Sequence, residues 1–500
     1  MKAYDVIFIH PPRQFKPLKN PLHIRAQHLA MPMGLFSMAD YLDRNGYSSK
    51  IINYSLEKRL NPRFSLHEKL KEHDFKVIAV DLHWINHCYG AMEILKLVKN
   101  KFPNAFTLLG GFSSSFYAKQ ILDNFEQVDG IIRGEAEVPI VELVKNLDSK
   151  EKVSNLMYRD DGKIRDNGIS FISKDLDDYN FSKVKYVDHW KEYVYHIDDV
   201  LHLSWMVEIA RGCPQNCMFC GGGSWAMQHV TGRKKFLMRS PERVIDDIKE
   251  ILDVAKIKRI YLSHGIFNAT KKFHYALQKL VRDENIEVGA DLEAYRLPVE
   301  HAFIKDFANT YTKEYSMLWF SVRSFSESFR KKMRTLVGRF DSSFNFTDKD
   351  LDDFLKACTA HELPVRLFWD IGYPFENIFE AFKNFYKAMK LLIQNIPARK
   401  YVSAWTEPII TSPASPVERY CDELGLKIHT KTFIDYYKLM KYSRMRMMPL
   451  DITVNYRTSY FTTLELKILH RLTYMANLFE LIVTDIQLQK RRDKKEKNKA

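Results

Sequence analysis

Short apolar runs alternate with amphipathic segments in the first 150 residues, and this alternation constrains the fold more than any other feature. Alternating strands and helices build parallel βαβ units, so we predict a doubly wound parallel sheet. The expected strands are Tyr4–Ile9, Ser49–Ile52, Val77–Val80, Phe106–Leu109 and Gly130–Ile132. The expected helices are Gly34–Asn45, Ala91–Lys99, Tyr117–Asn124 and Val138–Asn146.

Ligands of such sheets bind at the carboxyl ends of the strands. Turn-forming residues fall at two of these ends, His10-Pro11-Pro12 after the first strand and Gly110-Gly111 after the fourth. Residues 151–200 lose the alternation, and Asp160-Asp161-Gly162 there predicts a small hairpin in a linker.

From Trp205 the strand and helix pattern resumes, and about six βα units predict a partial barrel of the TIM type. The expected strands are Met206–Ala210, Arg259–Leu262, Val288–Ala294, Met317–Val322, Val365–Ile371 and Val402–Trp405. A helix over Pro241–Val254 is capped by Ser240, and another surrounds Lys272–Arg282. The pattern fades beyond Pro416, where Thr462–Gln489 predicts a long helix.

We therefore expect an α/β protein with four parts. These are a Rossmann-like sheet domain over 1–150, the linker over 151–200, the partial barrel over 201–412, and a mainly helical region with a basic tail over 413–500.

Composition narrows the setting. The chain has six cysteines in 500 residues, three of them clustered, which argues against a disulfide framework and favours a reducing cytoplasm. The start, MKAYDVIFIHPP, predicts a strand rather than a signal peptide, and no apolar stretch is long enough to predict a membrane span. The net charge of +14 is partly local to the tail Gln489–Ala500, and aromatic and basic residues are not interleaved elsewhere, so a nucleic-acid partner is not expected.

Cys213, Cys217 and Cys220 have the spacing C-x3-C-x2-C and follow a predicted strand directly. Three thiolates can hold a [4Fe–4S] cluster and leave one iron open to chelation by an amino and a carboxylate group. The glycines that follow, Gly221 and Gly222 among them, allow backbone to approach a ligand closely, and Phe219 can cover the cluster or stack on an adenine.

Two other interpretations of the cysteines stay open. A structural zinc site needs a fourth ligand, which His229 or His202 can supply. Alternatively, the three cysteines are buried and inert.

With an aromatic residue before its third cysteine, the motif resembles the signature of the radical S-adenosylmethionine (SAM) superfamily. The Arg-Gly pair before Cys213, the helix start Arg239-Ser-Pro-Glu242 and the later Gly372-Tyr-Pro-Phe-Glu376 share this resemblance. The first half resembles the cobalamin-binding domain of the B12-dependent subclass, through Met31-Pro-Met-Gly34, Leu109-Gly110-Gly111 and Asp129-Gly-Ile-Ile-Arg133-Gly134-Glu135. The resemblance covers about residues 1–410.

This resemblance implies that a reduced cluster gives one electron to SAM, which breaks to methionine and a 5′-deoxyadenosyl radical. In the cobalamin subclass, a second SAM methylates the corrinoid, which passes the methyl group to the substrate. It implies a [4Fe–4S] cluster, SAM and cobalamin as cofactors, and an electron donor such as ferredoxin or flavodoxin. The substrate, a small molecule or a peptide or protein, is not identified.

Several site residues follow from the same resemblance. For SAM they are Phe219, Gly221, Gly222, Glu293, Ser321 and Arg323, and for cobalamin Pro11, Pro12, Gly110, Gly111 and Glu135. Arg323 suits a carboxylate, although an ordinary ion pair is an alternative. Arg296 is placed near Glu293 at the barrel mouth. His264 stands where the superfamily has a Gly-Gly-Glu segment, and it is either a pocket residue or a loop histidine.

The sequence departs from the cobalamin mutases, which carry D-x-H-x-x-G after the first strand. Here that strand ends in His10-Pro11-Pro12-Arg13. Asp81-Leu-His83 follows a later strand, but residue 86 is not glycine, so we interpret His83 as a structural or pocket-edge histidine rather than the cobalt ligand. A vestigial domain that only caps the barrel is the alternative to cobalamin binding.

The leading hypothesis is a cobalamin-dependent radical SAM enzyme that methylates an unactivated carbon. One alternative is cyclisation or rearrangement in which cobalamin carries no methyl group. Minor alternatives are a structural zinc protein and a nucleic-acid-associated protein.

Overall fold

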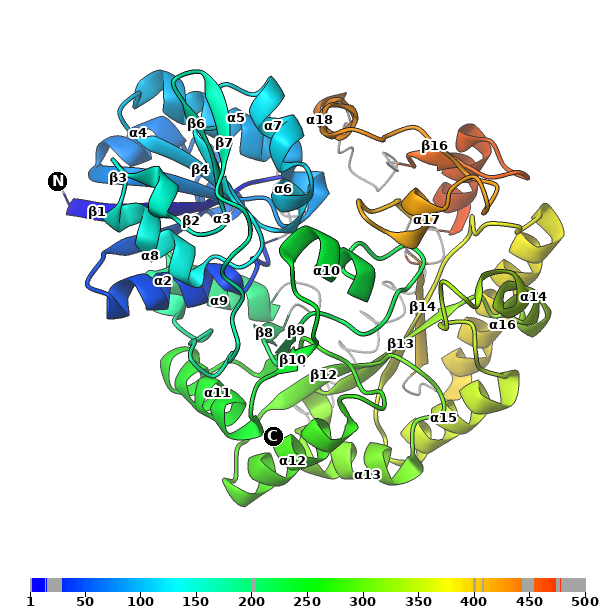
Figure 1. Ribbon diagram of the computed structural model, residues 1–500. Coiled ribbons are helices and arrows are strands. Elements are labelled where there is room, and N and C mark those ends of the chain that lie inside the picture. Colours follow the sequence, from blue (N-terminus) through cyan, green and yellow to red (C-terminus); the bar gives the residue numbers. More distant parts are fainter. Residues whose placement is uncertain are drawn as a thin grey trace.

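The computed structural model shows two parallel sheets and a C-terminal region that joins them (Figure 1). In Figure 1 the first sheet and its helices are blue to cyan, the second runs from green to yellow, and the C-terminal region is orange to red. The structure describes residues 2–13, 15, 29–199, 204–398, 402–406, 409–442, 454–473 and 477.

The first sheet has the strand order β2-β1-β3-β4-β5-β6-β7, and its first five strands are parallel. Alternate side chains of β1 enter two different cores, Val6 and Phe8 on one face and Ile7 and Ile9 on the other. The strands are β1 Lys2–His10, β2 Ser49–Asn53, β3 His73–Asp81, β4 Phe106–Gly110, β5 Gly130–Ile132, β6 Leu156–Asp160 and β7 Lys163–Asp166. The predicted doubly wound sheet is confirmed.

Helices cover both faces of this sheet, as burial of both faces requires. They are α2 Gly34–Arg44, α3 Tyr54–Leu60, α4 Leu66–Lys71, α5 Cys88–Lys101, α6 Phe112–Phe116, α7 Ala118–Asn124 and α8 Glu137–Lys145. The core that contains Val6 and Phe8 continues into the core of the second sheet, so the two sheets share one apolar interior.

The predicted hairpin forms, but it does not stand in a linker. β6 and β7 pair antiparallel, and β6 pairs antiparallel with β5, so the hairpin extends the first sheet. The linker proper follows it and carries α9 Trp190–Asp199. The described residues also contain four 3-10 turns, η1 Ile85–His87, η2 Lys150–Lys152, η3 Val184–Tyr186 and η4 Lys313–Tyr315.

The second sheet has six parallel strands in sequential order, β8-β11-β12-β13-β14-β15, with β8 and β15 at opposite edges. The strands are β8 Trp205–Val207, β11 Arg259–Leu262, β12 Gly289–Ala294, β13 Met317–Arg323, β14 Val365–Trp369 and β15 Val402–Thr406. The helices are α11 Pro241–Ala255, α12 Lys271–Asp283, α13 His301–Thr310, α14 Glu327–Val337, α15 Asp348–Ala360 and α16 Ile378–Ala398. The predicted partial barrel is confirmed. The Ser240 hydroxyl caps α11 by accepting from Arg243 N over 3.1 Å.

The strand predicted over Met206–Ala210 is interrupted. β8 ends at Val207, and β9 Ala210–Arg211 leaves the barrel to pair antiparallel with β10 Leu237–Met238. The bend is held by Ile209, whose N–H donates to the Ser263 hydroxyl over 3.1 Å. The cysteine segment therefore begins on a short separate ribbon, followed by α10 Ser224–Thr231.

The C-terminal region contacts the first sheet domain through α18 Phe433–Tyr442. Tyr437 donates to Glu93 of α5 over 2.9 Å, and Phe433 N donates to Gln120 of α7 over 2.9 Å. The region also contains α17 Pro416–Arg419, β16 Lys427–Ile428 and β17 Tyr456–Arg457. Residues 463–473 are helical, as predicted, while the rest of the predicted long helix apart from residue 477, and the basic tail, lie outside the described residues. Among the helices that the structure describes, none is both long and apolar enough to cross a membrane.

Candidate active site

The cysteine loop lies between β9 and α10 and is closed by its own backbone hydrogen bonds. Ser224 N donates to Gln215 O over 2.8 Å, and Cys220 N donates to Cys217 O over 3.0 Å. Gly222 N donates to the Cys220 sulfur over 3.3 Å. A backbone N–H that points at a sulfur stabilises its thiolate form, the form that binds metal.

The separation of the sulfurs bears on the choice between a single metal ion and a cluster. Among the described residues, Cys213, Cys217 and Cys220 do not form a group whose sulfurs all lie within 4.8 Å of one another. Tetrahedral zinc, with Zn–S bonds of about 2.3 Å, draws its sulfurs to about 3.8 Å from one another. The thiolates of a [4Fe–4S] cluster bind different irons and stand farther apart than those of one zinc ion, so the loop does not have the sulfur spacing of a preformed zinc site.

The histidines considered as a fourth zinc ligand give zinc no further support. His229 is hydrogen bonded through Nδ1 to Trp225 O over 2.8 Å, and its ring stacks on the Trp225 ring with centroids 4.1 Å apart. Arg419 covers the Trp225 ring at 4.0 Å. His202 lies outside the described residues.

Two buried contacts fix the middle of the loop. Met218 N donates to the Asp341 carboxylate over 2.8 Å, and Val417 N donates to Met218 O over 3.1 Å. Asp341 also accepts from Ser343 N over 2.7 Å and is only 4% exposed. The loop is therefore anchored to the barrel on one side and to α17 on the other.

Positive charge gathers around the sulfurs. Arg296 Nη2 lies 3.8 Å from the Cys217 sulfur and donates to the Ser342 hydroxyl over 3.0 Å. Burial raises the pKa of the Cys217 thiol to about 11, and the carboxylate of Asp341 adds to this effect, while Arg323 and Arg296 oppose it. Burial also raises the pKa of the other two thiols, and a bound metal ion would favour the thiolate form of all three.

The three glycines after Cys220 have different surroundings. A Cβ on Gly221 would lie 2.4 Å from Pro413 O, and one on Gly223 would lie 2.8 Å from the Asn216 side chain. A Cβ on Gly222 would meet nothing closer than the Cys220 sulfur at 3.8 Å. Gly221 and Gly223 therefore serve close packing of the chain on itself, and Gly222 alone faces open space beside the sulfur.

Phe219 packs between an aromatic side chain of the barrel and one of the C-terminal region. Its ring centroid lies 5.7 Å from that of Tyr373 and 6.2 Å from that of Tyr456. These contacts fix the side chain that precedes the third cysteine. Phe219 therefore has a packing role in addition to the predicted one, which is to cover a cluster or stack on an adenine.

Glu293, Ser321 and Arg323 meet at the carboxyl ends of β12 and β13, as the predicted SAM site requires. The Ser321 hydroxyl donates to Glu293 over 2.9 Å. Burial raises the pKa of the Glu293 carboxyl, although Ser321 and Arg323 lower it. Both Glu293 and Arg323 act electrostatically on the Cys220 thiol, so the group lies beside the cysteine loop.

Arg323 adopts an unusual backbone conformation. Its φ is +64°, in a region that side chains with a Cβ rarely adopt, and the register with β14 shifts between Ser321 and Arg323. Its guanidinium lies 3.9 Å from Asp370, and among the described residues its buried Nε has no hydrogen-bond partner. Backbone strain and an unpaired donor at one position indicate a functional side chain.

His264 fixes the start of the cysteine loop. Its Nε2 lies 2.9 Å from Gly212 O, the carbonyl just before Cys213, so Nε2 carries the proton that is donated. His264 O accepts in turn from His274 over 3.0 Å. Of its two predicted roles, these contacts favour the loop histidine.

The predicted cobalamin residues separate into two groups at the edge of the first sheet. Pro11 and Pro12 are buried, and Pro11 O is hydrogen bonded to Nδ1 of His87, at the end of η1, over 2.6 Å, so they shape the loop after β1. Gly110 and Gly111 are partly exposed, and Gly111 has φ +102°. The open part of this edge therefore follows β4 rather than β1.

Glu135, predicted at the corrinoid, lies in a buried ion-pair network. It forms ion pairs with Arg233, over 2.5 Å, and with Arg211, over 3.3 Å, and it is 8% exposed. Glu137 at the start of α8 also pairs with Arg211. Since Arg211 lies on β9, two residues before Cys213, these carboxylates tie the first sheet to the strand that delivers the cysteines.

Sequence reasoning missed this network and the Asp341 anchor. The sequence signals were the Arg-Gly pair before Cys213 and the segment that ends in Glu135, and both were interpreted only as resemblance, with no pairing between them. Nothing near Asp341 in the sequence points to Met218, which lies 123 positions away.

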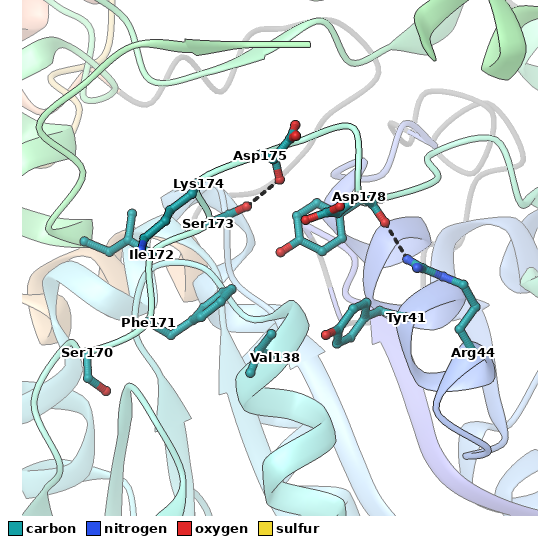
Figure 2. A pocket seen from close by; sticks show the side chains of 11 residues that line it. Tyr41, Arg44, Val138, Ser170, Phe171, Ile172, Ser173, Lys174, Asp175 and Asp178 are labelled. Atoms are coloured by element: carbon teal, nitrogen blue, oxygen red, sulfur yellow. Dashed lines mark hydrogen bonds between the residues drawn. The ribbon is translucent and has the colours of Figure 1, made fainter. Parts of the chain in front are cut away.

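A hollow of about 600 Å³ lies apart from these residues (Figure 2). Tyr41 and Arg44 of α2 form one wall, Val138 of α8 another, and residues 170–175 a third (Figure 2). None of its lining residues belongs to the cysteine loop, to the ends of β12 and β13, or to the carboxyl edge of the first sheet. It is not part of the candidate active site.

Comparison with known proteins gives a family match in the first part of the chain. The B12 binding domain family matches residues 21–144. The anaerobic magnesium-protoporphyrin IX monomethyl ester cyclase of Cereibacter sphaeroides is 28% identical over 38% of this chain and 30% of its own length. The hopanoid C-3 methylase of Methylococcus capsulatus is 25% identical over 47% of this chain and 44% of its own length. The chain thus matches less than half the length of either relative.

Among solved structures, the chain is similar to the radical SAM methyltransferase TsrM from Kitasatospora setae, solved with cobalamin and a [4Fe-4S] cluster bound. The TM-score is 0.62 at 12% identity, over 92% of this chain and 84% of that one. The fold and the cysteine loop define a protein with a B12 binding domain in front of a partial barrel. The resemblance seen in the sequence is confirmed for the fold, since residues 21–144 match the B12 binding domain family and the chain has the fold of TsrM.

Proposed function

We propose that this protein is a cobalamin-dependent radical SAM enzyme that methylates an unactivated carbon of its substrate. The observation that carries the proposal is the ion-pair network of Arg211 with Glu135 and Glu137. It joins the strand that leads to Cys213 to the loop after β5 of the B12-type sheet. Sites for a cluster and for a corrinoid are thereby held against each other.

The chain's own residues fit these cofactors. Cys213, Cys217 and Cys220 hold the cluster, and Arg323 with Glu293 binds the carboxylate and amino groups of SAM. Gly110 and Gly111 border the corrinoid. When bound, the cluster supplies the electron that cleaves SAM, and the corrinoid supplies a methyl carrier.

The relatives' names support the same reaction class. The hopanoid C-3 methylase is named for methylation of carbon, and TsrM is named a methyltransferase. The cyclase relative favours a second candidate, a ring-forming reaction in which cobalamin carries no methyl group. The substrate is a small molecule or a peptide or protein.

We further propose a cytoplasmic enzyme supplied with electrons by a ferredoxin or flavodoxin. All six cysteines are free thiols, which suits a reducing compartment. We retain the sequence-based division into domains at about 150, 200 and 412, except that the hairpin belongs to the first sheet.

The test is product analysis under anaerobic conditions. Protein reconstituted with iron, sulfide and hydroxocobalamin is incubated with SAM and a reductant. Formation of both 5′-deoxyadenosine and S-adenosylhomocysteine supports methylation, whereas deoxyadenosine alone supports the ring-forming alternative. Cys217→Ala should abolish deoxyadenosine, and Cys421→Ala, at an isolated cysteine of similar exposure, should not. A colourless protein that carries zinc would refute the proposal.

A further inference from the structure

A histidine stands exposed at the carboxyl edge of the first sheet. His83 follows β3 by two residues, and β3 lies between β1 and β4. The chain runs from β1 outward to β2 and then returns to β3 on the other side of β1, so the strand order reverses beside His83. Open α/β sheets bind their ligands at such a switch point.

The imidazole of His83 is not used by the protein. Its side chain is exposed, and among the described residues it has ring contacts with Trp84, at 5.3 Å, and Phe112, at 6.5 Å, but no hydrogen bond to either ring nitrogen. A structural histidine normally has its nitrogens satisfied by buried partners. The exposed imidazole without hydrogen-bonded nitrogens argues against the interpretation of His83 as a structural residue.

The two neighbouring histidines differ from His83 in this respect. His10, at the end of β1, is fully buried and bonds Asp81 over 2.9 Å. His87 is 1% exposed and its Nδ1 bonds Pro11 O over 2.6 Å. Of the three histidines at this edge, only His83 can reach a ligand that lies on the sheet.

The backbone of His83 is held rigidly by the turn after β4. Ser113 donates to His83 O through its hydroxyl over 2.9 Å. Gly111, at φ +102°, packs so closely that a Cβ there would lie 2.7 Å from His83 N. A fixed backbone that carries an exposed, unbonded imidazole is the arrangement of a preorganised ligand-binding residue.

We infer that His83 supplies the lower axial nitrogen to the cobalt of bound cobalamin. The inference rests on the proposed function, since it requires a corrinoid in this domain. Imidazole is the commonest metal ligand in proteins, and a cobalt ion in a corrin plane takes one axial ligand from below. The sequence lacks the Asp-x-His-x-x-Gly pattern after β1, and the structure places an equivalent donor after β3 instead.

The experiment uses the nitrogen nucleus as its readout. The full-length protein is produced in cells supplied with ¹⁵N-histidine and is then loaded with unlabelled hydroxocobalamin. The bound cobalt is reduced to cobalt(II). An axial ¹⁴N nitrogen splits the parallel lines of the electron paramagnetic resonance spectrum into triplets, and an axial ¹⁵N nitrogen splits them into doublets. We expect triplets in unlabelled protein and doublets in labelled protein.

Two variants assign the signal to one residue. His83→Ala should retain corrinoid but lose the splitting, whereas His429→Ala, at an exposed histidine of the C-terminal region, should keep it. Triplets that persist after labelling, an absence of splitting, or doublets in labelled His83→Ala would each overturn the inference and leave the proposed function standing. Failure of the wild-type protein to take up any corrinoid would overturn both.

Discussion

A single methyl group on Gly221 tests whether the cysteine loop is packed as the structure shows. In Gly221→Ala the new Cβ would lie 2.4 Å from Pro413 O, about 1 Å closer than ordinary van der Waals contact. Pro413 cannot retreat easily, because Ser415 N donates to Ser412 O across it and Val417 N is bonded to Met218 O. The new Cβ would therefore clash with a backbone carbonyl that is held in a rigid turn.

Overpacking of this kind costs about 2 kcal/mol, roughly a 30-fold change in the ratio of folded to unfolded protein. With a urea dependence of about 3 kcal/mol/M, the unfolding midpoint of the apo protein should fall by about 0.7 M. The loop should also retain less iron after anaerobic reconstitution, because its sulfurs are displaced. Midpoint and iron content are measured together.

Gly222→Ala is the matched control, one residue away in the same glycine run. Its Cβ would meet only the Cys220 sulfur at 3.8 Å, an ordinary contact. We expect an unchanged midpoint and weaker SAM binding, because the methyl group would occupy the open space beside the sulfur. Equal midpoints for the two variants would refute the packing argument.

Three further predictions concern charged groups. Burial raises the pKa of Glu376 to about 8, whereas the carboxyl of the unfolded chain loses its proton near 4.5. The free energy of unfolding should therefore fall as the pH rises between these two values. In Glu376→Gln, the urea midpoint should not show this dependence on pH. Glu137→Gln leaves the buried charge of Arg211 short of a partner and should lower the free energy of unfolding by about 3 kcal/mol, measured in urea. Arg296→Gln removes a positive charge beside Cys217 and should lower the reduction potential of the cluster by roughly 40 mV in a redox titration, equivalent to about 1 kcal/mol for one electron; an unchanged potential would contradict the assigned contact.

The candidate site was predictable where its signal is local. Cys213, Cys217 and Cys220 lie within eight positions, and their ligand chemistry depends only on residue type and spacing. Glu293 and Ser321 were predicted from the resemblance to the superfamily, and a hydrogen bond joins them at the carboxyl ends of two adjacent parallel strands. By contrast, Glu135 was expected at a corrinoid and lies in an ion pair with Arg233, which no local pattern could indicate.

Contacts between distant residues also explain why the strand predicted over Met206–Ala210 is interrupted. The residues have the composition of one continuous strand, and a periodicity argument gives no reason to divide them. The strand is divided because Ile209 N donates to the hydroxyl of Ser263, directly after β11, and because β9 pairs with β10. Tertiary contacts therefore override local propensity at the point where the chain turns toward its cysteines.

The sequence by itself determined the two mainly parallel sheets and the cluster of three thiols. Alternation and spacing operate within a few residues, and local propensity preserves them wherever the segment lies. Only the tertiary structure decided which groups surround those thiols and which histidine is left exposed. Asp341 accepts a hydrogen bond from Met218, 123 positions away in the sequence. Because β1 and β3 are adjacent, Asp81 of β3 is hydrogen bonded to His10 of β1, and His83 is left without this partner. Such pairs depend on how whole elements pack, which no short window of sequence encodes.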